Sequence, residues 1–373
     1  MRAALEAGAA PVPAPRQLRA GTALAAPIAV LLGWSVLDGG GADPSGLFLL
    51  GTAAIVLLAG ALVCVLAGLL PAPRPGRAGT VLAGAFACWV VWLGVSILWS
   101  IEADRSWDAL NRGLVYAALL GLGMLGGALL PRAPQLLAGC LALLCALAIG
   151  WALAGKVVPA LGPDVARSAR LRDPVGYWNA LALLVAMSLP LWLWLAARRG
   201  HAASLRALAA AAVVPAGVAL LLTASRGGLV VAIVAVLVWL ALSPARLEGL
   251  VALLLAVPVV GAIGAWALTR SALTSEGSAV AGRERAGLEL GLVLVAGTAL
   301  VLALAFAAAK AEEREPVTPQ RRRRLLRATA ALAGGAVVLS LAVAALSVDD
   351  PLGWVRARAD EFRNPPSADV TQG

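Results

Sequence analysis

The sequence predicts an all-α integral membrane protein, a bundle of about eleven transmembrane helices. Of its 373 residues, 61% are hydrophobic and only 13% are charged, and the mean hydropathy is +0.89. A soluble domain carries about 25% charged residues, so this chain has too few charges to cover a water-facing surface. Its apolar residues also come in runs of roughly 20, the helix length that crosses a hydrocarbon core about 30 Å thick. These observations exclude a soluble domain.

Eleven apolar runs, each bounded by charged or Pro/Gly-rich sequence, define the expected spans. Pro27, Pro190, Pro215 and Pro258 fall inside runs, where neighbouring helices can satisfy the carbonyl groups that each proline leaves free. In chain order the expected spans are Gly21–Leu37, Gly46–Leu70, Ala78–Trp99, Gly113–Leu130, Gln135–Ala154, Gly176–Ala197, Leu205–Thr223, Gly227–Leu242, Leu250–Leu268, Gly287–Ala309 and Leu326–Leu346.

The positions of the basic residues predict the orientation of the bundle. More than half of the 30 Lys and Arg fall in the connections on one side, including a basic segment from Lys310 to Arg327. Positive connections face the cytoplasm. We therefore expect the N-terminus inside and the C-terminus outside: residues 1–20 form a cytoplasmic tail, residues 21–346 the transmembrane domain, and residues 347–373 an extracytoplasmic tail.

The net charge of +10 and the four cysteines do not point to nucleic acid or to a metal. Topology explains most of the charge, and no basic stretch carries the interleaved aromatic residues that bind nucleic acid. Cys64, Cys88, Cys140 and Cys145 all lie in apolar runs without a metal-binding spacing, so we expect them to be small buried side chains.

The expected outer side holds more cations than topology requires. Lys156, Arg170 and Arg172 cluster with Asp173 before the sixth span, and Arg226 lies at the turn between the seventh and eighth. An arginine between apolar helices is costly, so it is a candidate functional residue, and its planar fork suits phosphate oxygens. Alternatively, Arg226 reaches to the membrane interface, and Arg170 and Arg172 pair with Asp173 in a solvated loop. The functional interpretation predicts an outward-facing phosphate or diphosphate site.

Two motifs at these residues resemble the O-antigen ligase and O-antigen polymerase superfamily. They are RLRDPVGYWN at 170–179 and LLTASRGG at 221–228, with a weaker similarity in LWSIEADRSW at 98–107. The resemblance covers residues 80–245. It implies a GT-C-like glycosyltransferase in the bacterial cytoplasmic (inner) membrane, working on the outer face.

The resemblance also implies the reaction and its partners. A glycan would pass from an undecaprenyl diphosphate carrier to a hydroxyl of a lipid or glycan acceptor, with no metal and no cofactor. Arg170 and Arg226 correspond to diphosphate-binding arginines, with Arg172 as a neighbour. Tyr177 and Asn179 would line the approach, although Tyr177 also fits an interfacial aromatic belt.

One departure from the family concerns acceptor activation. The family usually carries a large outer loop with a histidine and further helices, which this chain lacks before Gly373; its single histidine, His201, is expected in a cytoplasmic loop. No catalytic residue is therefore assigned. Two alternatives stay open: a transporter or flippase for a polyprenyl-linked glycan, and a non-catalytic, truncated subunit of a polysaccharide-synthesis complex.

Overall fold

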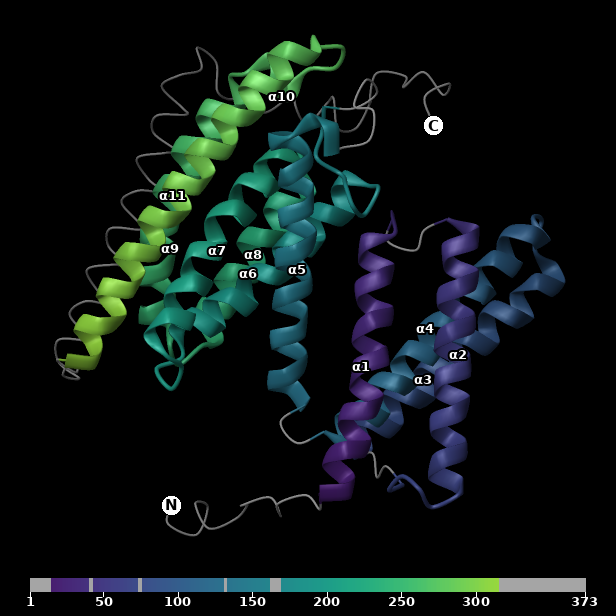
Figure 1. Ribbon diagram of the computed structural model, residues 1–373. Coiled ribbons are helices and arrows are strands. Elements are labelled where there is room, and N and C mark those ends of the chain that lie inside the picture. The colour runs from purple at the N-terminus through teal and green to yellow at the C-terminus, as the bar shows by residue number, and fades with distance from the viewer. Residues whose placement is uncertain (1–14, 40–42, 73–75, 131–132, 162–168, 315–373) are drawn as a thin grey trace. The chain divides into compact units, whose positions relative to one another are not determined.

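The computed structural model describes residues 15–39, 43–72, 76–130, 133–161 and 169–314, and this part of the chain is helical without a strand (Figure 1). Eight of the described helices are long and apolar enough to cross a membrane, and the apolar part of α1 and the whole of α8 are shorter apolar helices. The all-α class and the multi-pass hydropathy are thus confirmed. The eleventh expected span, Leu326–Leu346, and the tail at 347–373 lie outside the described residues, as do residues 1–14.

Each of the first ten expected spans coincides with one helix, while the short α10 was not predicted. The helices are α1 (Pro15–Leu37), α2 (Pro44–Leu66), α3 (Arg77–Ser96), α4 (Ala103–Leu129), α5 (Ala133–Val157), α6 (Trp178–Ala197), α7 (Ala203–Leu222), α8 (Arg226–Leu242), α9 (Arg246–Leu268), α10 (Ser271–Thr274) and α11 (Val280–Arg314), with 3₁₀ turns η2 (Ile97–Trp99) and η3 (Pro159–Leu161).

Several helices extend beyond the apolar runs that predicted them. Helix α1 begins at Pro15, inside the expected tail, and α11 runs from Val280 to Arg314 instead of from Gly287 to Ala309. Helix α4 begins at Ala103, so Asp104 and Asp108 are exposed residues of its first turns and not of a loop. The reason is that a helix satisfies its own backbone hydrogen bonds and can continue with polar side chains after the apolar run has ended.

Small residues let the central helices approach closely. Helix α7 is the most buried of the candidate spans, and it packs against α6 and α9. A Cβ added at Gly217 of α7 would lie 2.6 Å from Val260, and one at Gly264 of α9 would lie 2.3 Å from Leu221. A larger residue at either crossing would therefore force the facing Val260 or Leu221 side chain to shift, and close packing over small residues is common between membrane helices.

A short turn at residues 198–202 joins α6 to α7, which confirms that these helices are packed neighbours. The turn is held by Arg206, whose Nε donates to the Ala196 carbonyl at 3.1 Å, and by the ion pair of Arg199 with Glu248 at 2.9 Å. His201 lies in this turn against Trp194, with ring centroids 5.8 Å apart. Its prediction as a loop residue is confirmed.

The four cysteines correct one expectation. All are free thiols, but only Cys145 is buried; Cys64 is half-buried, and Cys88 and Cys140 are exposed. The expectation of four buried side chains was wrong because a helix face that lies on lipid is as apolar as one that lies in a protein core, so an apolar run does not distinguish the two.

Candidate functional site

The segment that precedes α6 packs against the junction of α7 and α8. Buried Leu171 donates its N–H to the carbonyl of Leu222 at 3.1 Å. A tight turn follows, in which the Gly176 N–H donates to the carbonyl of Arg172 at 2.9 Å. Gly176 has a φ of +82°, a left-handed conformation that favours glycine. This turn explains why the first motif has a glycine at position 176. The chain after the turn begins α6, where Asn179 contacts the start of α8.

A chain of side-chain hydrogen bonds connects the two motifs. Ser225 donates its hydroxyl to Oδ1 of Asn179 at 2.7 Å, and Nδ2 of Asn179 donates to the Tyr177 hydroxyl at 2.7 Å. The same serine Oγ accepts from the Gly228 N–H at 3.0 Å and so caps the N-terminus of α8. Asn179 therefore links the start of α6 to the start of α8.

Gly228 brings α6 and α8 together behind this chain. A Cβ built on Gly228 would lie 2.3 Å from the Cβ of Ala182, whereas one on Gly227 would meet nothing within 4 Å. Real Cβ atoms do not approach so closely, so a larger residue at Gly228 would force α8 and α6 to move apart. The second glycine of SRGG is consequently a packing residue of the α6–α8 contact.

The three predicted arginines have different surroundings. Arg170 is exposed, and its guanidinium lies over the Trp178 ring at 5.1 Å from the centroid. Arg172 is half-buried, and Arg226 is exposed at the first position of α8. Among the described residues, neither Arg172 nor Arg226 forms an ion pair with a carboxylate.

The backbone contact between Leu171 and Leu222 joins the residue after Arg170 to a residue four positions before Arg226. No described contact joins the guanidinium groups of these two arginines, so their convergence on a single anion stays a prediction. Asp173, the expected partner of Arg170 and Arg172 in a solvated loop, is half-buried and lies within electrostatic range of Lys156 of α5.

Each aromatic residue of the first motif makes one contact with a polar or charged side chain. Tyr177 is 49% exposed, stacks at 4.9 Å from Trp178 and accepts the Asn179 hydrogen bond. Trp178 supplies the ring beneath Arg170. Both contacts hold these rings at the N-terminus of α6. This position suits an aromatic belt as well as residues that line the approach of a glycan.

Ser225 is the functional candidate that the sequence analysis did not select. The signal for it was present, since a serine that directly precedes an apolar helical run is typical of an N-cap. Its second bond, to Asn179, joins residues 46 positions apart and has no signature in the sequence. In the described residues, no group of three His, Cys, Asp or Glu side chains is arranged to hold a metal ion.

In comparisons with protein-family models, curated proteins and solved structures, the chain matches none. The resemblance of the two motifs to the O-antigen ligase and polymerase superfamily therefore stays a prediction.

Proposed function

We propose that the protein is a membrane glycosyltransferase of the O-antigen ligase or polymerase type. It transfers a glycan from an undecaprenyl diphosphate carrier to an acceptor hydroxyl of a lipid or glycan, on the outer face of the cytoplasmic membrane. The observation that carries the proposal is the hydrogen bond between Ser225 and Asn179, 46 residues apart, which joins the two motifs on which the family resemblance rests.

The cations beside this bond suit the leaving group. As the acceptor oxygen attacks the anomeric carbon, the bond from that carbon to the diphosphate oxygen breaks and the diphosphate keeps the electron pair. The acceptor hydroxyl loses its proton to solvent as the new bond forms, and the configuration at the anomeric carbon inverts. Arg226 and Arg170 stabilise the negative charge that grows on the diphosphate, because fixed positive charge lowers the energy of a transition state in which charge develops.

The bond network explains why the site would sit at the N-terminus of α8. Ser225 holds the first turn of α8 against α6, and Arg226, the first residue of α8, directly follows this serine. The neutral groups of Asn179 and Tyr177 can orient sugar hydroxyls by hydrogen bonding, while the arginines hold the charged end of the donor. A bidentate guanidinium fixes both the position and the orientation of a phosphate group.

The test is an arginine-to-lysine exchange in the producing bacterium. Arg226→Lys keeps the charge but loses the bidentate fork, so we expect glycan transfer to fall at least roughly tenfold while protein level and membrane insertion stay normal. The measurement is the amount of transferred glycan and of undecaprenyl diphosphate-linked glycan, by mass spectrometry. Arg285→Lys is the matched control, because Arg285 has an 85% exposed side chain on α11.

The location of the accumulated intermediate separates transfer from transport. A transferase defect leaves the lipid-linked glycan on the outer face, where a membrane-impermeant probe labels it. Accumulation on the inner face would contradict the proposal and support a flippase. Normal transfer by Arg226→Lys would contradict recognition of the diphosphate by this residue.

A further inference from the structure

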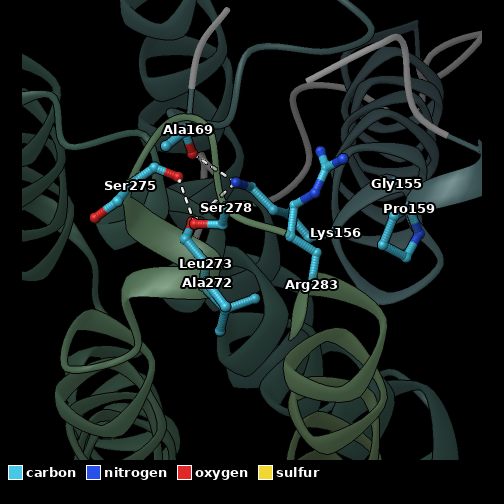
Figure 2. A pocket seen from close by; sticks show the side chains of 10 residues that line it. Gly155, Lys156, Pro159, Ala169, Ala272, Leu273, Ser275, Ser278 and Arg283 are labelled. Carbon is cyan, nitrogen blue, oxygen red and sulfur yellow. Dashed lines mark hydrogen bonds between the residues drawn. The ribbon is translucent and has the colours of Figure 1, made fainter. Parts of the chain in front are cut away.

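A cavity of about 200 Å³ lies between α5, α10 and the start of α11, apart from the residues of the proposed glycan site (Figure 2). Its polar lining comes from segments far apart in the chain: Lys156, Ala169, Ser275, Ser278 and Arg283. A pocket for a drug-sized ligand has about 300–1,000 Å³. This cavity therefore suits a small group and not a whole sugar or a prenyl chain.

Lys156 is the first cation of this cavity. Its ammonium donates to the carbonyl of Ala169 at 2.5 Å and to that of Leu273 at 3.0 Å, which Figure 2 shows as dashed lines. An ammonium group has three N–H donors. Two of them tie α5 to the segment before α6 and to α10, and the third remains for a ligand.

Arg283, in the first turn of α11, is the second cation. Its Nε is buried and makes no hydrogen bond in the described part of the protein. Buried donors nearly always have a partner, and one without a partner calls for an unseen acceptor. The start of a helix also attracts negative charge, so the acceptor expected here is an anion.

The charges around the cavity favour the same ligand. Lys156 lies within electrostatic range of Arg283, a like charge, and, within the described part of the chain, of the carboxylate of Asp173. Among the described residues that line the cavity there is no carboxylate. Two neighbouring cations repel each other unless an anion lies between them, so an anion bound in the cavity would relieve the repulsion between Lys156 and Arg283.

We propose that this cavity binds a phosphate group, either as free inorganic phosphate or as the headgroup of an anionic membrane lipid. The free N–H of Lys156 and the Nε of Arg283 donate to its oxygens, and the nearby hydroxyls of Ser275 and Ser278 border it. The proposal does not depend on glycosyl transfer, because none of these residues belongs to the glycan site.

Binding to the purified full chain tests the proposal. In detergent, inorganic phosphate should raise the thermal unfolding midpoint above that in chloride at equal ionic strength, and radiolabelled phosphate should bind. In nanodiscs, the thermal unfolding midpoint should be higher in a phosphatidylglycerol bilayer than in a phosphatidylcholine bilayer. A response in detergent identifies free phosphate as the source, and a response confined to nanodiscs identifies the lipid headgroup; either supports the proposal. If the wild-type chain responds neither to inorganic phosphate in detergent nor to phosphatidylglycerol in nanodiscs, the proposal is overturned.

Arg283→Gln supplies the site-specific test, with Arg285→Gln as its control on the same helix. We expect Arg283→Gln to weaken phosphate binding roughly tenfold or more, since it removes a charge-assisted bond. Arg285→Gln should bind as the wild type does, because Arg285 is exposed and pairs with Glu289 at 3.3 Å. Equal losses in both variants would show general charge attraction and overturn the site, and if Arg283→Gln does not fold, the wild-type arms alone decide.

Discussion

Asn179 shows how one residue can organise a site. Its amide oxygen accepts from Ser225 on α8 and its amide nitrogen donates to the hydroxyl of Tyr177, so both polar ends of the side chain are used. An amide offers an acceptor and two donors in a fixed plane. One N–H of Asn179 remains for a ligand. This geometry explains why an asparagine suits the position better than an acid or an apolar residue of similar size.

The residue-scale prediction concerns Ser225. Ser225→Ala removes the N-cap of α8 and the bond to Asn179 together, so we expect the chain to lose about 1–2 kcal/mol of stability. Reversible denaturation in detergent measures the loss. Ser96→Ala is the control, since the Ser96 hydroxyl bonds only to the Leu93 carbonyl of its own helix. Equal stability of the two variants would mean that the link between α6 and α8 contributes nothing.

At the scale of elements, hydropathy located the helices better than it located their ends. The first ten apolar runs each meet one helix, but α4 and α11 start well before theirs. Polar and charged residues occupy the added turns, for example Glu102 and Arg105, which pair at 2.6 Å across the start of α4. An apolar run marks where lipid or core begins, whereas backbone hydrogen bonding and capping determine where a helix ends.

The element-scale prediction uses the two glycines of SRGG. Gly228→Ala places a methyl group against Ala182 and should destabilise the protein by about 1–3 kcal/mol by forcing α6 and α8 apart. Gly227→Ala meets open space and removes a flexible residue from a helix, so it should be neutral or stabilising by up to about 1 kcal/mol. Thermal unfolding of both variants provides the comparison. A reversed order of stability would show that the close approach at Gly228 is not a constraint.

At the scale of the whole molecule, several helices carry a cation at one end. Lys156 at the end of α5, Arg226 at the start of α8 and Arg283 at the start of α11 come from elements that pack through shared cores and backbone contacts. In a membrane protein, cations concentrated at helix ends lie at the level of lipid headgroups. The glycan site and the phosphate cavity would therefore both face anionic groups.

The whole-molecule prediction is the orientation. A reporter that is active only outside the cytoplasm should be silent when inserted at Gly200, in the turn between α6 and α7, and active when inserted at Gly277, between α10 and α11. The reason is the bias of basic residues toward one set of connections. Western blotting of each fusion controls for protein level. The opposite pattern would place Arg170 and Arg226 on the cytoplasmic side and remove the proposed outer-face reaction.

By itself, the sequence determined the all-α class, the positions of the first ten apolar helices and the residue types suited to an anion. Each of these follows from local properties: a run of apolar side chains must be helical in lipid, and an arginine between such runs is costly wherever it lies. Only the tertiary structure decided which of these residues meet. Ser225 reaches Asn179 across 46 positions, and Lys156 reaches Leu273 across 117. Such contacts depend on the close approach of helices over glycine and alanine, and no local pattern of hydropathy encodes that distance.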